Sequence, residues 1–491
     1  MMNFQTIFHN IFLFCLLLRI RLQQVNCSFH HDSPPDSGYL RFTYEATDFS
    51  PAKAYDYIII GGGTAGCPLA ATLSESYSVL LLERGSSLNK SVLYESNFFQ
   101  TLLAANDNDS PAQTFISEDG LQIVRARILG GGSMINGGFY SRADDYSYDN
   151  AGIEWDMRAV ERAYEWVENS IVTHPARLNR FQTSLFNGLL ESGVVPDSGF
   201  TFDHVQGTKI GGSTFNDSGI RHGAVELLNN ANPENLDVLV HAMVDRVIFS
   251  TFNPLAAVGV VYHDSNGKYH EVHVRTDGEV ILSAGAIGSP QLLLLSGLGP
   301  TSYLSSLNIP VVREHPFIGQ FMADNPRTGI IGGKITRPKS KGSLHLLSAS
   351  NVTVSPSVRF NYYNHTEDIN QCWNAVEVIR KLLATPTMEE YKFGGQDFKF
   401  IGLPLPEESS DYETTASFCR DTLSTYWHMH GGCLPNKVVD SHLKVIGVDS
   451  LRVVDASTFF NSPGTNPQAT IMMLGRYIGV KMLEERAAIR S

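Results

Sequence analysis

The chain has 491 residues, of which 43% are hydrophobic and 18% are charged, and its formal net charge at pH 7 is -13. This length and apolar content suffice for two or more domains with large cores. The charge is spread along the chain without acidic or basic blocks, which argues against nucleic acid as a partner and favours small-molecule ligands.

The N-terminal segment 1–26 predicts a signal peptide. Its apolar run IFLFCLLL has the length of a signal-peptide core and is too short to cross a bilayer. No later stretch has eighteen uninterrupted apolar residues, so we expect no membrane anchor. The protein is therefore expected to be secreted, or endomembrane or vacuolar, and N-glycosylated. N-x-S/T sequons begin at Asn89, Asn108, Asn216, Asn351 and Asn364.

The stretch YDYIIIGGGTAGCPLAATLSESYSVLLLERG predicts a strand, a helix and a second strand. Residues 57–60 and 78–82 are apolar runs of strand length, and residues 69–73 open a helical pattern between them. The second run ends at Glu83, about twenty residues after the first glycine, which is the spacing of a β-α-β dinucleotide-binding unit.

Three glycines in this stretch form the pattern G-x-G-x-x-G, and each has its own physical reason. Gly61 permits a tight turn, Gly63 lets the backbone approach a pyrophosphate, and Gly66 lets the helix pack closely on the strand. The helix N-terminus then faces the phosphates with free N–H groups. Glu83 can accept hydrogen bonds from ribose hydroxyls. The alternative is a glycine-rich turn without a ligand, with Glu83 as a solvated strand end.

Two further small-residue segments follow. In RARILGGGSMINGGFYSRA, residues 130–133 and 136–139 offer backbone that can press against a flat ring system. In GEVILSAGAIGSPQLLLLSGLGP, residues 279–283 predict a buried strand, followed by a turn and a helix that begins near Ser289 and Pro290. Backbone contact with a cofactor is therefore expected from the first segment.

Four cysteines belong to the expected folded body: Cys67, Cys372, Cys419 and Cys433. Secretion permits a disulfide, and we expect Cys372 to pair with Cys419, although connectivity cannot be read from sequence. Cys67 follows the glycine turn and is expected to be a small buried hydrophobe.

The segment TYWHMHGG contains two histidines, His428 and His430. If the segment is extended, both imidazoles point to the same side, as a metal site would need. No cysteine or carboxylate stands nearby at ligand spacing, so metal is not favoured. A catalytic base with a neighbour, or two tolerated polar residues, are the remaining interpretations.

Four stretches together resemble the glucose-methanol-choline (GMC) oxidoreductase family, from about residue 40 to the C-terminus. They are the glycine fingerprint, LGGGSMINGGFYSRA, GAIGSPQLLLLSGLG and LRVVDASTFFNSPGTNPQAT. Within that family the chain is similar to two plant groups. RFTYEATDFSPAKAYDYIIIGGGTAGCPLAATLSE resembles the (R)-mandelonitrile lyases, while GFTFDHVQGTKIGGSTF and SPGTNPQATIMMLGRY resemble the HOTHEAD-type proteins.

The resemblance implies an α/β GMC fold: a Rossmann-type FAD-binding domain and a smaller α+β substrate domain with an antiparallel sheet. The alternating pattern of residues 352–362 fits that sheet. The cofactor is expected to be FAD, bound without a covalent link because no histidine stands in the glycine cluster around Ser133. The FAD-binding domain is expected at 40–145, 205–325 and 433–484, and the substrate domain at 146–204 and 326–432.

The family's cofactor contacts carry over to matching positions of this chain. Those expected at the pyrophosphate and adenosine are Gly61, Gly63, Thr64, Ala65, Gly66, Glu83 with the following Arg84, and Val244. Those expected along the isoalloxazine and ribityl chain are Ile128, Ser133, Asn136, Gly137, Gly138 and Phe139. Those expected from the C-terminal part are Trp427 at the pocket, Asp455 and Ala456 near the diphosphate, and Asn466 and Pro467 at the pyrimidine end.

The resemblance also implies the chemistry of the histidine pair. His428 corresponds to the family's catalytic base, which removes the hydroxyl proton of an alcohol while hydride leaves carbon for the flavin. His430 is expected to be a supporting residue. The mandelonitrile lyases have a second histidine where this chain has Asn466, which can donate a hydrogen bond but cannot act as a base. Alcohol oxidation is therefore favoured over cleavage of a hydroxynitrile to an aldehyde and HCN, which stays as the alternative.

One departure from the family concerns the stretch TGIIGGKITRPKS, at 328–340, where related proteins carry a segment several tens of residues longer. That segment contributes sheet strands and part of the active-site wall. Its loss could open the pocket, expose a sheet edge or prevent stable folding. An inactive or misfolded form is therefore a third interpretation. Substrate identity, oxidase against dehydrogenase, and oligomeric state are left open by the sequence.

Overall fold

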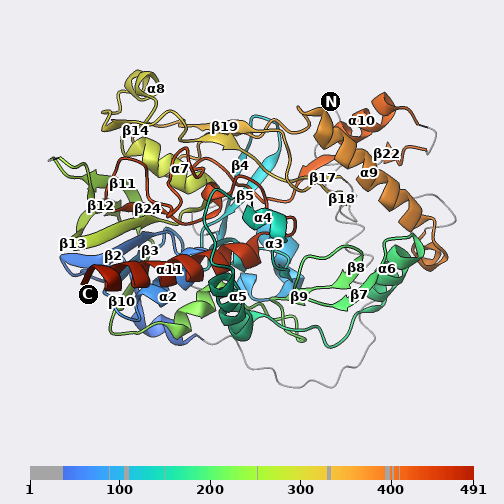
Figure 1. The fold of residues 1–491 in the computed structure, drawn as a ribbon, viewed down its shortest axis with the longest axis horizontal. Helices are drawn as coiled ribbons and strands as arrows, with labels where there is room; N and C mark the ends of the chain where they lie inside the picture. The colour runs from blue at the N-terminus through green and yellow to red at the C-terminus, as the bar shows by residue number, and fades with distance from the viewer. Residues whose placement is uncertain are drawn as a thin grey trace.

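The computed structural model describes residues 37–87, 89–103, 110–149, 151–251, 253–328, 333–392, 399–400, 403–407 and 410–490. The expected signal peptide and the sequon at Asn108 lie outside these ranges. Figure 1 shows a large sheet with its helices in one half of the view. The helices α6 (Arg180–Glu191), α9 (Thr366–Leu383) and α10 (Tyr412–Asp421) lie in the other half.

An eight-stranded sheet carries the dinucleotide-binding motif, in the order β1-β10-β3-β2-β13-β12-β11, with β24 also paired to β13. Its strands are β1 (Thr43–Glu45), β2 (Ala54–Ile60), β3 (Val79–Leu82), β10 (Leu236–Val240), β11 (Met243–Phe249), β12 (Ala257–His263), β13 (Tyr269–Leu282) and β24 (Leu451–Val453). The pairs from β1 to β13 and the pair β13–β24 are parallel, whereas β11, β12 and β13 are antiparallel. The strands expected at 57–60, 78–82 and 279–283 are confirmed, and their C-terminal ends agree within one residue, whereas β2 begins three residues and β13 ten residues earlier than expected.

The central strands of this sheet are apolar because other elements cover their faces. All four residues of β3 are buried, as are six of the seven in β2, which is the pattern of parallel strands with elements on their faces. The helix α2 (Gly66–Leu73) is fully buried and packs against α11 (Gln468–Arg490), which also contacts α5 (Met157–Ile171). Figure 1 shows α11 running along the sheet.

Two glycines allow this close packing. A Cβ on Gly66 would lie 2.0 Å from the carbonyl oxygen of Gly61, so α2 reaches the end of β2 only because position 66 has no side chain. A Cβ on Gly475 in α11 would lie 2.3 Å from the carbonyl oxygen of Ala65. The role expected for Gly66 is therefore confirmed in its geometry.

Two small antiparallel sheets are formed by strands from the chain's second half. One has the order β18-β17-β23, from Gly333–Lys334, Pro326–Thr328 and Leu423–Thr425. The other has the order β16-β19-β20, from Gln320–Met322, Gly342–His345 and Ser357–Arg359. The short stretch at 328–340 thus still supplies strand β18 and one end of β17.

The structure has further helices, strand pairs and short 3-10 helices. The helices are α3 (Phe98–Leu103), α4 (Asp145–Asp149), α7 (Gly285–Leu295) and α8 (Thr301–Ser306). The strand pairs are β4 (Ala112–Ile116) with β5 (Gln122–Ala126), β6 (Phe139–Tyr140) with β9 (Gly212–Ser213), β7 (Asp197–Phe200) with β8 (Thr208–Ile210), β14 (Leu298–Gly299) with β15 (Arg313–Glu314), and β21 (Lys399–Phe400) with β22 (Leu403–Pro404). Short 3-10 helices span Gly38–Phe42, Lys90–Val92, Glu95–Asn97, Gly131–Met134, Ala224–Asn230, Pro386–Tyr391 and Ala456–Thr458.

Two local predictions were wrong. The helix expected to begin near Ser289 begins at Gly285, one turn earlier, because the Asp455 carboxylate accepts the Gly285 N–H at 2.8 Å and the Ser289 hydroxyl at 2.5 Å. The strand expected at 352–362 is limited to β20, because the carbonyls of Val352 and Val354 accept hydrogen bonds from the Gln291 side chain instead of from a neighbouring strand.

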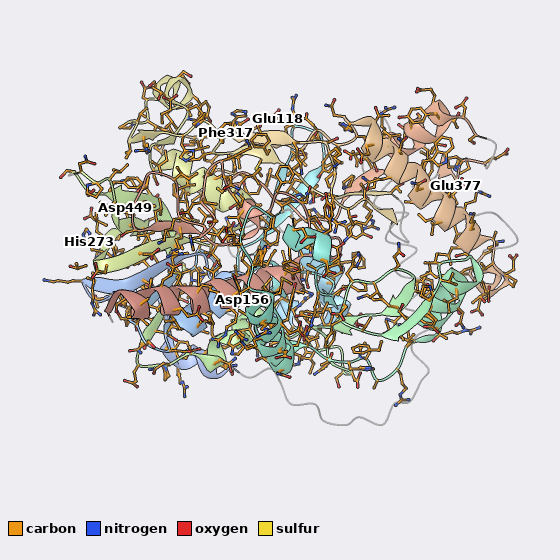
Figure 2. All side chains as sticks on the ribbon, viewed as in Figure 1. Glu118, Asp156, His273, Phe317, Glu377 and Asp449 are labelled. Carbon is orange, nitrogen blue, oxygen red and sulfur yellow. A yellow bond between two sulfur atoms is a disulfide. The ribbon has the colours of Figure 1, made fainter. Side chains whose placement is uncertain are left out.

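A second cluster of buried apolar side chains lies on α9, α10 and their surroundings, separate from the core around the large sheet. The expected disulfide joins Cys372 of α9 to Cys419 of α10 and lies in this cluster. Cys67 is buried and free, as expected for a small hydrophobe, and Cys433 is also buried and free. The disulfide therefore links the two helices of the smaller core. Figure 2 shows α9, with Glu377 labelled, far from the large sheet.

Removing this disulfide is expected to destabilise the unit of α9 and α10. The bond closes a loop with a sequence separation of 47, and losing such a crosslink costs about 2–4 kcal/mol, mainly by freeing the unfolded chain. Scanning calorimetry of the variant C372A/C419A should show unfolding at a lower temperature than the wild type. The variant C433A, which removes a buried thiol outside any disulfide, is the control. Unfolding of the double variant at the wild-type temperature would contradict the prediction.

Candidate active site

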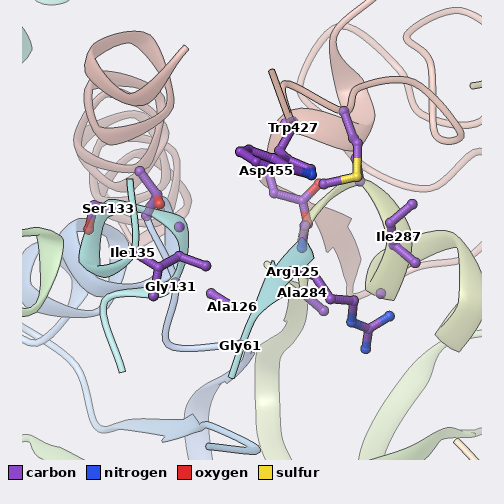
Figure 3. Close-up of a pocket in the computed structure, with 18 of the residues that line it drawn as sticks. Gly61, Arg125, Ala126, Gly131, Ser133, Ile135, Ala284, Ile287, Trp427 and Asp455 are labelled. Atoms are coloured by element: carbon purple, nitrogen blue, oxygen red, sulfur yellow. The ribbon is translucent and has the colours of Figure 1, made fainter. Parts of the chain in front are cut away.

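A cavity of about 610 Å³ lies at the carboxyl ends of the parallel strands, where ligands bind in sheets of this type. Ile60 ends β2, Leu82 ends β3 and Ser283 follows β13, and all three line the cavity. The cavity is also lined by every cofactor or catalytic residue expected from the sequence except Gly66: Gly61, Gly63, Thr64, Ala65, Glu83, Arg84, Ile128, Ser133, Asn136, Gly137, Gly138, Phe139, Val244, Trp427, His428, Asp455, Ala456, Asn466 and Pro467. Figure 3 shows Gly61, Gly131, Arg125 and Trp427 around it.

The floor of the cavity is a cradle of backbone. Gly61 has a φ of +100°, which lets the chain turn sharply at the end of β2. A Cβ on Gly131 would lie 2.7 Å from the Cα of Gly63, so the two glycine loops touch, and Gly130 N–H donates to the carbonyl of Gly62 at 2.6 Å. Such an approach of bare backbone beside the start of α2 suits a pyrophosphate.

Glu83 lies at the end of β3 and is 5% exposed. Its two carboxylate oxygens accept the N–H groups of Gly62 at 2.9 Å and Gly85 at 2.8 Å. Burial raises the pKa of Glu83, while Arg84 and these hydrogen bonds oppose the shift. The carboxylate is therefore fixed in place and keeps lone pairs for a ribose hydroxyl.

Arg84 and Arg125 place two guanidinium groups at this end of the cavity. Arg84 donates to Gln113 and to the carbonyl of Ala126, both at 2.7 Å, and burial lowers its pKa to about 10. The buried NH1 of Arg125 has no hydrogen-bond partner among the described residues. Burial, with the charges of Arg84 and Arg127, also lowers the pKa of Arg125. Sequence reasoning missed Arg125, although it is the first residue of the quoted stretch RARILGGGSMINGGFYSRA.

Asn136 and Ser133 are held by protein partners. The Asn136 amide donates to Gln468 at 2.8 Å, and its oxygen accepts from Gly138 N–H and Arg221, both at 3.0 Å. The Ser133 hydroxyl donates to the carbonyl of Gly130 at 2.7 Å. These contacts tie the glycine cluster to the start of α11, so its backbone is presented to the cavity in a fixed shape.

His428 lies at the opposite end of the site and is positioned by the buried carboxylate of Asp324. Asp324 accepts the backbone N–H of His428 at 2.7 Å, the N–H of Asn325 at 2.8 Å, the hydroxyl of Tyr362 at 2.6 Å and the hydroxyl of Thr425. Burial raises the pKa of Asp324 to about 6, against these four hydrogen bonds. These hydrogen bonds therefore fix the backbone at His428.

The His428 ring contacts Asn325, a residue that the sequence did not single out as part of the site. Asn325 Nδ2 lies 3.2 Å from His428 Nδ1 and donates to the Ser462 hydroxyl at 2.8 Å, while its buried Oδ1 has no partner among the described residues. Burial, followed by the positive fields of Lys334 and His430, holds the pKa of His428 well below its usual value. His428 is thus a neutral imidazole at neutral pH.

The two histidine rings have different surroundings. Trp427 has a φ of +56°, so the backbone turns directly before His428, and His430 Nδ1 lies 3.0 Å from the backbone oxygen of His428. His430 is buried, and its pKa is lowered to about 3 by that burial. The described ranges contain no group of three or more metal-ligating side chains.

Asn466 and Lys334 complete the catalytic end. Asn466 lines the cavity and accepts a hydrogen bond at its Oδ1 from Lys334 Nζ at 3.3 Å. Arg327, the residue opposite Lys334 in the β17–β18 register, also lines the cavity and lies over the Tyr426 ring at 5.3 Å. Sequence reasoning missed Arg327 and Lys334, although both stand in or beside the quoted stretch 328–340.

The residues present fit FAD, the dinucleotide that the sequence implies. The glycine cradle suits a pyrophosphate, the fixed Glu83 suits a ribose, and the buried guanidinium of Arg125 lacks a partner that an anionic cofactor can supply. Aromatic rings of Phe98, Phe99 and Trp427 line the same cavity. The donor set and the cavity therefore agree with this cofactor.

Known proteins and family models resemble this chain over most of its length. Family models described as GMC oxidoreductase match residues 55–327 and 338–475. The chain is 50% identical to sinalpyl alcohol oxidase Nec3 of Nesocodon mauritianus over 93% of each chain, and 46% identical to (R)-mandelonitrile lyase 1 of Prunus serotina over 92% of this chain and 91% of the lyase. The first alignment runs over 521 positions, more than the whole chain, so the relative carries inserted residues.

Among solved structures, a fungal aryl-alcohol oxidase superposes with a TM-score of 0.73 at 19% identity, over 89% of this chain and all of the other. This likeness concerns the fold. The described residues contain no helix that is long and apolar enough to cross a membrane. From the two family models, the relatives and the shared fold, the chain belongs to the GMC oxidoreductase family.

Proposed function

We propose that this protein oxidises an alcohol to an aldehyde, with FAD as the cofactor and His428 as the base. The observation that carries the proposal is the pairing of a neutral imidazole at His428 with a donor amide at Asn466 on the cavity that holds the dinucleotide cradle. FAD supplies the acceptor for the hydride that leaves the substrate carbon. The relative named sinalpyl alcohol oxidase supports this class of reaction.

The residues proposed to hold FAD are those carried over from the family. Gly61, Gly63, Thr64 and Ala65 would meet the pyrophosphate, with Gly66 allowing their approach, and Glu83, Arg84 and Val244 would hold the adenosine. Ile128, Ser133, Asn136, Gly137, Gly138, Phe139 and Trp427 would lie along the ring system. Asp455 and Ala456 would approach the diphosphate, and Asn466 with Pro467 the pyrimidine end. Their common cavity supports this assignment.

The base role sets a requirement on His428. A proton can be taken at Nε2 only when Nδ1 carries the ring hydrogen. A half-turn of the Asn325 amide would bring its oxygen to Nδ1 and to the Ser462 hydroxyl, and would give this buried oxygen the partners that it lacks. Asn325 in that orientation orients the base in the way that a third group does in a catalytic triad.

Hydroxynitrile cleavage is the second candidate, favoured by the 46% identity to an (R)-mandelonitrile lyase. The lyase reaction needs a base at the cyanohydrin hydroxyl and no net redox change. Asn466 cannot supply that base, so His428 would have to act alone. The donor amide suits the developing alkoxide of an alcohol better, which places oxidation first. An inactive shortened form, the third interpretation, would show neither reaction.

The cellular setting and the domain division are also proposals. The apolar run in 1–26 supports secretion or an endomembrane or vacuolar location, and exposed side chains at Asn351 and Asn364 support glycosylation there. The FAD-binding domain would comprise 40–145, 205–325 and 433–484, and the substrate domain 146–204 and 326–432. The separate apolar cluster around α9 and α10 supports the second unit.

Substitution of Gly66 by alanine should abolish FAD binding. The new Cβ would lie 2.0 Å from the carbonyl oxygen of Gly61, so α2 must move away from the cradle. Gly120→Ala is the control, because Gly120 has a φ of +81° but nothing within 4 Å, and so adds only local backbone strain. The G66A protein should be colourless with a wild-type far-UV circular dichroism spectrum. A wild-type flavin absorbance in G66A would refute the proposed role of the glycine cradle in FAD binding.

Substitution of His428 by glutamine tests the proposed base. Loss of a general base should lower the rate of anaerobic flavin bleaching by an alcohol about 10²–10⁴-fold, while the flavin stays bound. In the wild type the active form is the neutral imidazole, and its lowered pKa keeps it neutral in acid. Protonation of His428 should therefore slow bleaching only below pH 6.5. Unchanged bleaching in H428Q would exclude His428 as the base.

Substitution of Asn325 by aspartate should move the acid limb of the pH profile, where the rate falls because His428 is protonated, to higher pH. A carboxylate beside Nδ1 favours the imidazolium, so it raises the pKa of His428 and the neutral base is lost sooner as pH falls. Stopped-flow bleaching between pH 5 and 8 measures the limb. An acid limb at the wild-type position would show that Asn325 does not act on the histidine ring.

A further inference from the structure

Lys334 lies beside the proposed catalytic pair, and the described part of the chain provides no acidic partner for it. It stands on β18, directly opposite Arg327 of β17, and residues opposite each other in an antiparallel pair share a face. Its Nζ donates to Asn466 Oδ1 at 3.3 Å, its one hydrogen bond within the described residues. Its charge acts on His428, so it lies near both members of the pair.

The hydrogen bond fixes which way Asn466 faces. An ammonium group can only donate, so the amide oxygen of Asn466 must be the atom turned to Lys334. The amide nitrogen then points away from Lys334. Because Asn466 also lines the cavity, its N–H groups are available to a ligand oxygen there.

Asn466 is supported from a second side as well. Gly464 has a φ of +46°, and a Cβ there would lie 2.9 Å from both Arg337 NH2 and Asp144 Oδ2, which form an ion pair. The loop before Asn466 therefore rests on this pair. Its backbone is fixed there, and the orientation of the amide is left to Lys334.

We propose that Lys334 is a positioning residue that turns the Asn466 amide nitrogen toward the substrate oxygen and strengthens it as a donor. The inference rests on the proposed alcohol oxidation. In that reaction the hydroxyl proton passes to His428, hydride passes from carbon to FAD, and the C–O bond becomes C=O. An ammonium hydrogen-bonded to the amide oxygen polarises the amide, so its N–H holds the negative charge developing on the substrate oxygen more strongly.

The charge state of Lys334 predicts a specific pH dependence of the bleaching rate. Burial lowers the pKa of Lys334 from 10.5 to about 7. The ammonium form is the active one, so the bleaching rate should fall as pH rises through about 7. This limb is opposite in sign to the limb of His428, which lies below pH 6.5.

The other titratable groups around Lys334 do not cause the same fall in rate near pH 7. His428, His204 and Arg337 lie on the neighbouring segments, and Arg327 stands opposite. Burial lowers the pKa of His204, the charges of Lys209, Lys334 and Arg337 lower it further, and Asp144 opposes the shift, so the pKa of His204 lies below 6.5. The helix α9 faces β18 with the apolar side chains of Ala375 and Ile379.

The test compares K334M and K334R with the wild type, using benzyl alcohol for bleaching and trifluoroethanol as an alcohol that resists oxidation. K334M should bleach about 10- to 100-fold more slowly, as expected for loss of a charge-assisted contact, without the limb near pH 7. It should also bind trifluoroethanol about tenfold more weakly at pH 6, measured by the shift of the flavin spectrum. K334R should regain the rate, with the limb moved out of range because arginine stays charged.

K209M is the matched control. Lys209 is a partly buried lysine whose pKa burial lowers to about 8, but its hydrogen bonds among the described residues go to the Ser141 hydroxyl at 2.7 Å and to backbone carbonyls instead of to Asn466. It should keep the wild-type profile and trifluoroethanol affinity. Equal trifluoroethanol affinity in K334M and wild type would overturn the inference, whether or not alcohols are oxidised. Absence of bleaching in the wild type, with the affinity difference intact, would instead overturn the proposed oxidation alone.

Discussion

The buried carboxylate of Asp324 is the constraint on which the catalytic end depends. It accepts hydrogen bonds from two backbone N–H groups and two hydroxyls, which come from its own segment, from β20's C-terminal side and from the region of β23. A carboxylate in apolar surroundings is costly unless such partners satisfy it. Because the four partners come from different segments, Asp324 holds the segments of Asn325, Tyr362 and His428 together at one point.

The site therefore combines two kinds of rigidity. At the dinucleotide end, bare backbone and the absence of side chains at positions 61, 63, 66 and 131 set the shape. At the catalytic end, side-chain hydrogen bonds set it, through Asp324 and through the contact between Lys334 and Asn466. The first suits a large cofactor held by its backbone contacts, and the second suits a proton transfer that needs one imidazole in one orientation.

The dinucleotide end could be predicted from the sequence because its physics is local. Gly61, Gly66 and Glu83 lie within one strand-helix-strand unit, so their spacing already determines their geometry. Asn325 and Lys334 were missed because the contacts that place them at the site, with His428 and Asn466, join segments far apart in the chain. The early start of α7 was missed for the same reason, since Asp455, 170 residues away, satisfies its first N–H. Only a packed structure brings such partners together.

The proposed reaction is an oxidation in which the substrate carbon loses hydride. The most direct measurement adds benzyl alcohol, a long-chain alcohol or racemic mandelonitrile anaerobically to the purified protein while recording the flavin spectrum and any released cyanide. We expect the flavin band to bleach with an alcohol and no cyanide to form. Release of cyanide from mandelonitrile with the flavin band unchanged would contradict the account and make the protein a hydroxynitrile lyase.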